Sequence, residues 1–119
     1  MNDSEEIEAV KAYVALSNAH RLTLILPMFA EEAVYRSSYV GEFNGRGVIG
    51  DMMADFFSRF PDVRWDVPAY RRAGNRAVDF EFVMTATEVL TGNHIERNGL
   101  ERIEFTEDGL ISLLEVTSP

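Results

Sequence analysis

Hydrophobic residues in the first half of the chain recur at intervals of three and four, the spacing that places side chains on one face of a helix. This spacing predicts a first helix whose buried face carries Ile7, Val10, Tyr13, Val14 and Ser17. It also predicts a helix over residues 46–59, whose apolar side is made of Val48, Ile49, Met52, Met53, Phe56 and Phe57. Pro61 follows this segment, and proline is common just beyond a helix end because it cannot continue the helix.

The mostly apolar segment 22–29 lies between these two helices and indicates a further buried helix. Pro27 conflicts with a regular helix there, because an interior proline removes a hydrogen bond and costs about 3 kcal/mol. The helix therefore either begins late, with Pro27 in its first turn, or is kinked. We expect a short, irregular helix.

Beyond Pro61 the pattern changes to alternation, which is typical of strands with one buried face. The clearest case is segment 76–90, in which one face carries Val78, Phe80, Phe82 and Met84. Gly-Asn and Asp-Gly turn signals separate the predicted strands, which cover residues 63–67, 76–90, 94–106 and 110–116. This order predicts an α+β fold, with three N-terminal helices packed on one face of a strongly curved, mostly antiparallel sheet.

The composition limits the function classes. At 119 residues and 13.5 kDa, the chain predicts a single domain over residues 1–119. Its net charge of −9 repels phosphate backbones, so we expect no nucleic-acid partner. The absence of cysteine excludes disulfides and thiolate chemistry. No apolar run approaches the roughly 18 residues of a membrane span, and the charged start is unlike a signal peptide. We therefore expect a cytoplasmic protein without a membrane partner.

No motif indicates a metal or a cofactor. The two histidines, His20 and His94, are far apart in the sequence and form no His-x-His or His-Glu-x-x-His motif. Gly45, Gly47 and Gly50 have the spacing of a dinucleotide-binding loop, but they follow a turn rather than a strand of a βαβ unit. We therefore expect neither a metal site nor a bound cofactor.

Two segments carry a resemblance to a known superfamily. Residues 29–35 (FAEEAVY) read as a helix end that delivers the chain into a strand. Residues 43–47 (FNGRG) read as a turn, followed by the amphipathic helix and the proline stop at 60–62 (FPD). In this order and spacing the chain resembles the nuclear-transport-factor-2-like superfamily, and within it the SnoaL-like and ketosteroid-isomerase-like proteins. The resemblance implies a cone-shaped barrel with a pocket, whose chemistry depends on a few polar residues inside.

The resemblance to ketosteroid isomerases implies roles for three positions. In those enzymes a tyrosine on the first helix and a protonated acid on a late strand bind the enolate oxygen, and an aspartate moves the proton. By the order of motifs these positions fall on Tyr13, Glu101 and Ser37. A serine cannot accept a proton at neutral pH without a base beside it, so classical steroid isomerisation is not expected. Tyr13 and Glu101 are the candidate catalytic residues.

The orientation of Glu101 has two interpretations. Alternation places it on the same face as Ile103 and Phe105, so it would point to the apolar interior, where burial raises the pKa of a carboxyl group. Alternatively, a bulge at Gly99 reverses the alternation and exposes Glu101, because glycine inside a strand often marks a bulge. The sequence leaves both open.

The remaining candidate site residues are assigned to ligand binding. They are Phe29, Tyr35, Ser37, Phe56, Trp65, Phe82, Arg97 and Ile103. The aromatic side chains form pocket walls if a cavity exists, and ordinary core packing if it does not. Arg97 lies in a segment similar to the arginine-bearing strand of the limonene-epoxide-hydrolase branch, but Gly99 stands where that branch has its acid. The alternative is that Arg97 pairs with Glu81 or Asp79 across a hairpin.

These observations predict a protein that binds a hydrophobic, uncharged or weakly polar small molecule. Acid-assisted isomerase, cyclase or hydrolase chemistry on Glu101 is one interpretation, and a non-catalytic dimeric ligand-binding or interaction module is the other. A homodimer is predicted because segment 76–90 is apolar on both faces. The outer face, with Val83, Val89, Ile95 and Leu114, is expected to be covered by a second copy.

Overall fold

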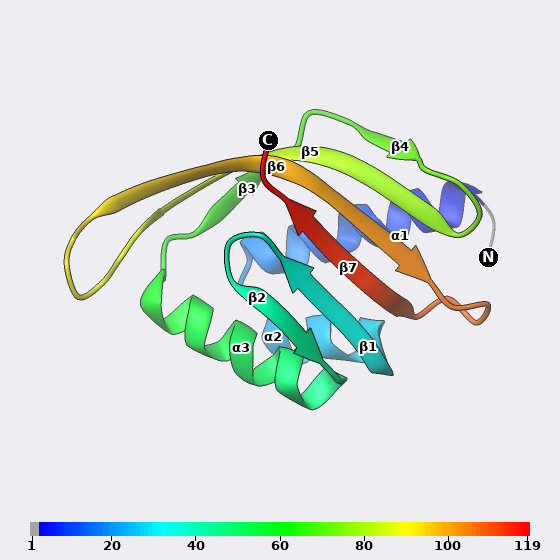
Figure 1. Ribbon diagram of the computed structural model, residues 1–119, viewed down its shortest axis with the longest axis horizontal. Coiled ribbons are helices and arrows are strands. Elements are labelled where there is room, and N and C mark those ends of the chain that lie inside the picture. Colours follow the sequence, from blue (N-terminus) through cyan, green and yellow to red (C-terminus); the bar gives the residue numbers. More distant parts are fainter. Residues whose placement is uncertain (1–2) are drawn as a thin grey trace.

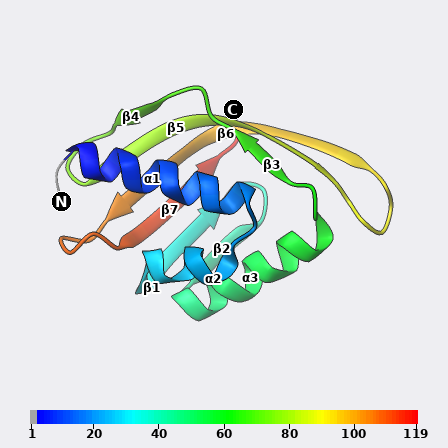
Figure 2. The ribbon, with the colours of Figure 1, turned by 180° about the vertical axis from the view of Figure 1, so that it is seen from behind.

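The computed structural model describes residues 3–119. The helical elements are α1 (Asp3–Asn18), α2 (Leu22–Ile25), the 3₁₀ turn η1 (Leu26–Met28) and α3 (Arg46–Arg59). The strands are β1 (Phe29–Ser37), β2 (Gly41–Asn44), β3 (Arg64–Asp66), β4 (Tyr70–Arg72), β5 (Ala77–Thr87), β6 (His94–Phe105) and β7 (Ile111–Thr117). The helices lie on one side of a strongly curved sheet, and α1 crosses that face (Figures 1 and 2).

The helices follow the sequence predictions closely. The expected helix over residues 46–59 has these bounds in the structure. Pro27 lies at the start of η1, which continues directly from the four-residue α2, so the expectation of a short, irregular helix is confirmed. This position needs no backbone donor, because the first N–H groups of a helical turn have no partner within the turn.

The sheet has the strand order β2-β1-β7-β6-β5-β3, with β4 also paired to β5. Most neighbours are antiparallel, as predicted, but β1 and β7 are parallel, which the expected simple meander did not include. The strands β2 and β4 were not predicted either. The sheet has the expected strong curvature but is not closed, because β2 and β3 end it and do not pair with each other in the described chain. Helix α3 connects these two end strands along the chain.

The core lies between the helices and the inner face of the sheet. Its fully buried side chains include Phe80, Ile103 and Leu114. The expectation that Leu114 and Ile95 lie on the outer face is wrong, because Leu114 is fully buried and Ile95 packs against the core. The pairing of β6 with β7 shifts register between Glu104 and Phe105, whose partners are Leu113 and Ile111. This irregularity near the start of β7 interrupts simple alternation, so Ile111 and Leu114 are both buried.

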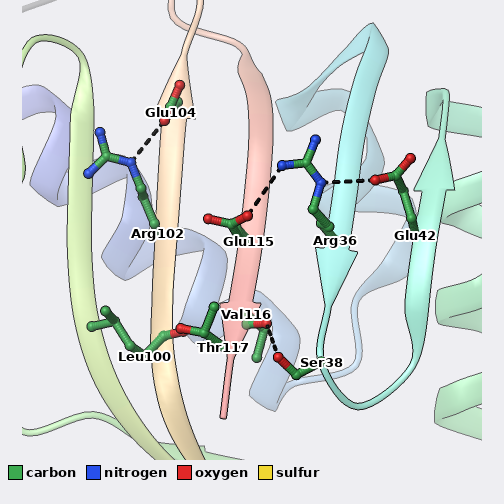
Figure 3. Close-up of polar contacts among 9 residues, drawn as sticks. All are labelled: Arg36, Ser38, Glu42, Leu100, Arg102, Glu104, Glu115, Val116 and Thr117. Carbon is green, nitrogen blue, oxygen red and sulfur yellow. Dashed lines mark hydrogen bonds and ion pairs between the residues drawn. The ribbon is translucent and has the colours of Figure 1, made fainter. Parts of the chain in front are cut away.

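The outer face of the sheet carries ion pairs between neighbouring strands (Figure 3). Arg36 on β1 binds Glu42 on β2 at 2.9 Å and Glu115 on β7 at 3.2 Å. On β6, Arg102 binds Glu104 at 2.8 Å. The hydrogen bond from Arg36 lowers the pKa of Glu42, as expected for a carboxylate beside a guanidinium. Strong charge on this face leaves the inner face as the place for an apolar pocket.

Candidate functional site

A cavity opens between the inner face of the sheet and helices α1 and α3. Its empty space is about 590 Å³ when the open solvent at its mouth is included, and the part that a water-sized sphere can occupy is about 60 Å³. Aromatic and methionine side chains dominate its surface, with a few polar groups among them. The lining residues are Tyr13, Ser17, Tyr35, Ser37, Tyr39, Val40, Met52, Met53, Phe56, Phe57, Trp65, Phe82, Met84, Arg97, Glu101 and Val116. Cavities of this composition are typical small-molecule sites.

Most of the residues singled out from the sequence meet at this cavity. Both candidate catalytic residues line it, and so do Tyr35, Ser37, Phe56, Trp65, Phe82 and Arg97. Two candidates, Phe29 and Ile103, are instead closed in the core with no exposed surface, so their assignment as pocket walls needs correction. Phe29 packs edge-on against the ring of Tyr13 at 5.9 Å, and Ile103 lies between Val78 and Leu114 in the sheet. Both residues pack behind the side chains that line the cavity and do not line it themselves.

Several lining residues were missed by the sequence analysis. Met52, Met53 and Phe57 belong to the predicted apolar face of α3, and their spacing could have identified them as candidates. Val116 could have been found from the alternation along β7. Tyr39 lies in the turn between β1 and β2, where no periodic signal exists.

Glu101 lies on the inner face of β6 and is only 5% exposed. The pairing of β5 with β6 is continuous from Ala77 to Thr87, so no bulge reverses the alternation at Gly99. The buried interpretation of Glu101 is therefore confirmed. Burial in apolar surroundings raises the pKa of its carboxyl group from 4.5 to about 8. Among the described residues, no hydrogen bond or ion pair reaches this carboxyl, which is therefore a neutral proton donor at neutral pH.

Gly99 is required by close packing rather than by a bulge. A Cβ atom at this position would lie 2.5 Å from the backbone oxygen of Thr117 and 3.1 Å from the ring of Phe82. Phe82 is the cross-strand partner of Gly99, so its ring lies over the glycine. The missing side chain thus lets β7 and an aromatic cavity wall approach β6 closely.

Two tyrosine hydroxyls accompany the acid. Burial is the main cause that raises the pKa of Tyr13 well above its usual value, with smaller effects from Tyr35 and Glu101. Burial also raises the pKa of Tyr35, and the Glu101 charge acts in the same direction while Arg97 opposes it. Both phenols therefore keep their protons at neutral pH. Tyr13, Tyr35 and Glu101 therefore present neutral O–H groups to the cavity, in addition to the hydroxyls of Ser17, Ser37 and Tyr39 that also line it.

Trp65 is fixed at the other side of the cavity by the end of α1. Its backbone N–H donates to Asn18 Oδ1 at 2.8 Å, and Asn18 Nδ2 donates to the backbone oxygen of Trp65 at 2.9 Å. The ring lies 6.1 Å from Phe56 and 6.5 Å from Phe57, measured between centroids. This arrangement makes a rigid aromatic wall, because both a backbone clamp and ring packing hold the indole.

Arg97 projects from the inner face of β6, opposite Met84. Its guanidinium lies over the ring of Tyr39, 5.0 Å from the centroid. The alternative interpretation, an ion pair of Arg97 with Glu81 or Asp79 across the hairpin, is wrong. Glu81 lies 4.0 Å from Arg71, and Asp79 lies 3.5 Å from Arg102. Alternation explains the difference, since Arg97 and these acids belong to opposite faces of the hairpin.

Within residues 3–119, no group of three or more histidine, cysteine, aspartate or glutamate side chains is arranged to hold a metal ion. None of the helices described is both long enough and apolar enough to cross a membrane.

The fold is shared by solved structures of low sequence identity. SalBIII, described as an epoxide hydrolase/cyclase-like enzyme in pyran ring formation of the polyether salinomycin, superposes with a TM-score of 0.88 at 16% identity, covering 99% of this chain and 93% of that chain. A protein with a ketosteroid isomerase-like fold from Catenulispora acidiphila DSM 44928, in complex with trimethylamine, superposes with a TM-score of 0.80 at 19% identity. The match covers 92% of this chain and 83% of that chain. An NTF2-like protein of unknown function from Exiguobacterium sp. 255-15 gives 0.83 at 14% identity, covering 93% and 98%.

At these identities the likeness establishes the fold alone. No curated protein matches the sequence. The profile of the SnoaL-like domain, however, matches residues 10–114, which is most of the chain. The matched range includes all the strands except the end of β7, together with both candidate catalytic residues. The chain therefore belongs to the SnoaL-like domain family, with the nuclear-transport-factor-2-like fold that its sequence predicted.

Proposed function

We propose that this protein binds a hydrophobic organic molecule in the cavity and that Glu101 donates a proton to an oxygen atom of that molecule. The reaction would be an isomerisation, a cyclisation or a hydrolysis. The observation that carries the proposal is the carboxyl group itself: it is buried, it faces an aromatic cavity and no described residue binds it. A general acid works best when its pKa is close to the operating pH, and the pKa of Glu101 is about 8.

The other polar groups support the same step. Protonation of a carbonyl, ether or epoxide oxygen makes the attached carbon more electrophilic. The hydroxyls of Tyr13 and Tyr35 can donate hydrogen bonds to the charge that develops on the same oxygen. The aromatic and methionine walls exclude water, which strengthens these interactions. The cyclase-like description of SalBIII is consistent with this type of substrate.

A specific observation favours a second candidate, a non-catalytic ligand-binding module. Of the described residues that line the cavity, Glu101 alone carries a carboxylate, and Ser37 occupies the position that the isomerase resemblance assigns to the base. A reaction that needs both an acid and a base has no second group here. Acid-assisted opening or closure of a ring needs no second group, because the Glu101 carboxylate left after proton transfer can take up the proton that the attacking water or substrate hydroxyl releases.

The test uses Trp65, the only tryptophan of the chain, as a reporter inside the cavity. Neutral cyclic ketones, ethers and epoxides are first screened by quenching of its fluorescence and by thermal shift. Compounds that bind are then incubated with the protein and analysed for products. Glu101→Gln should keep the affinity within about threefold and lower turnover by about 10²–10⁴, the usual contribution of a general acid. Binding without turnover in the unaltered protein would favour the binding module, and no quenching by any compound would refute both.

A further inference from the structure

Arg97 is placed differently from the arginines that form ion pairs on the sheet. Arg36 and Arg102 lie on the outer face, each beside at least one carboxylate. Arg97 lies on the inner face, is only partly exposed and contributes to the cavity lining. No carboxylate of the described residues lies within 4.0 Å of its guanidinium, which stacks over the ring of Tyr39. Its hydrogen-bonding edge is therefore left for something that enters the cavity.

The charge of the cavity contrasts with that of the protein. The chain has 20 acidic and 11 basic residues, yet the cavity lining contains a single acid among its described members. Because burial keeps that acid protonated below about pH 8, the lining is positive at neutral pH through Arg97. A partly buried guanidinium without a partner loses hydration, and a bound anion restores the lost interactions. Carboxylate and sulfonate groups fit the planar fork of arginine.

The acid and the arginine are spaced for the two ends of one ligand. Arg97 and Glu101 are four residues apart on β6, which is about 13 Å between their backbone positions at the rise of a strand. Both point into the same cavity. Tyr35 lies near both groups, because the charge of ionised Glu101 raises the pKa of its hydroxyl and the charge of Arg97 lowers it. The ring of Phe82, which covers Gly99, provides an apolar surface midway between them.

We infer that Arg97 binds an anionic group and that the ligand is a hydrophobic organic anion. A carboxylate or sulfonate lies at Arg97, a ring system fills the aromatic middle, and an acceptor oxygen reaches Glu101. Only the placement of this acceptor oxygen rests on the proposed function, since anion binding at Arg97 does not require any reaction. The inference replaces the uncharged ligand expected from the sequence.

The test compares two dyes with the same skeleton. N-phenyl-1-naphthylamine is neutral, and 8-anilinonaphthalene-1-sulfonate carries one added sulfonate. Energy transfer from Trp65 to each dye reports binding to the protein, and a response to Arg97→Met without a response to the control variant below assigns it to the cavity. Arg97→Met, which keeps an unbranched apolar stem, should weaken the sulfonate dye about tenfold or more and the neutral dye less than twofold. Arg97→Lys should recover part of the loss, because lysine keeps the charge but lacks the fork.

Arg21→Met is the matched control, because Arg21 is exposed, lies outside the cavity lining and changes the net charge equally. It should leave both affinities unchanged. An equal loss of both dyes in Arg97→Met would assign Arg97 a packing role and overturn the inference, as would an equal effect of Arg21→Met. If neither dye reaches Trp65, the inference and the proposed function both fail. If only Glu101→Gln lacks its effect on turnover, the proposed function fails and the anion site stands.

Discussion

The buried acid of the cavity makes a quantitative prediction about stability. Glu101 has a folded pKa of about 8 and an ordinary value of 4.5. Between these two pH values the folded protein holds a proton that the unfolded chain has released. The free energy of unfolding must therefore decrease as pH rises through this interval. The contribution is complete below about pH 4.5 and is lost at about pH 8.

The magnitude follows from the separation of the two pKa values. Each pH unit corresponds to about 1.4 kcal/mol, so the whole interval corresponds to about 5 kcal/mol. Glutamine at this position resembles the protonated acid and has no charge to desolvate. Glu101→Gln should therefore be as stable as the unaltered protein near pH 5 and more stable by about 3 kcal/mol or more near pH 8.

The measurement is urea unfolding, followed by circular dichroism, of both proteins over about pH 5 to 9. The difference between the two stability curves isolates Glu101, because all other groups are shared. Glu32→Gln, which removes an exposed carboxylate outside the cavity, is the control for the loss of one negative charge. A difference curve without slope between pH 5 and 8 would refute the reasoning and leave Glu101 without a raised pKa.

Three further predictions concern the cavity wall, the sheet and the assembly. Trp65→Ala should cost about 2 kcal/mol, less than the ~3–5 of a fully buried aromatic residue, and should abolish dye binding when this is followed by the fluorescence of the directly excited dye. A full core loss in urea unfolding with intact binding would place the ring away from the cavity. Gly99→Ala should cost about 1–3 kcal/mol, because the new methyl group clashes with β7, whereas Gly47→Ala meets nothing within 4 Å and should not destabilise the protein. Equal urea midpoints for the two variants would contradict this. We propose a homodimer because Val83 and Val89 remain exposed; sedimentation as a monomer at micromolar concentration would refute it.

The sequence predicted those parts of the site that depend on local periodicity. The bounds of α3 and the inward direction of Glu101 follow from spacings of three to four and of two, and both are confirmed. Local spacing says which way a side chain points but not how deep it lies. Phe29 and Ile103 point inward as expected, yet helix packing closes the space around them. The depth of the cavity is set by elements distant in the sequence.

The errors in the sheet have the same origin. The position of Leu114 depends on a register shift near the end of β6, and the residues around it gave no sign of this shift. The parallel pairing of β1 with β7 joins segments at opposite ends of the chain, so no turn between neighbouring strands announces it. Arg97 was assigned to ligand binding, and alternation along β6 does place it on the inner face; the alternative of an ion pair across the hairpin considered only charge and not the face of the sheet.

The parallel pairing of β1 with β7 also determines the order in which the protein can be completed. Tyr35 is paired with Leu114, so the wall that carries Tyr35 has no neighbour on that side until β7 has been synthesised, after all the elements from β2 to β6. Contacts so distant in sequence pay a large loop-closure entropy before they stabilise anything, which slows folding. The cavity can therefore form only late, when the final strand docks between β1 and β6. A ligand that binds there holds β7 in place, so bound ligand should slow the release of β7 and protect its backbone amides from hydrogen exchange.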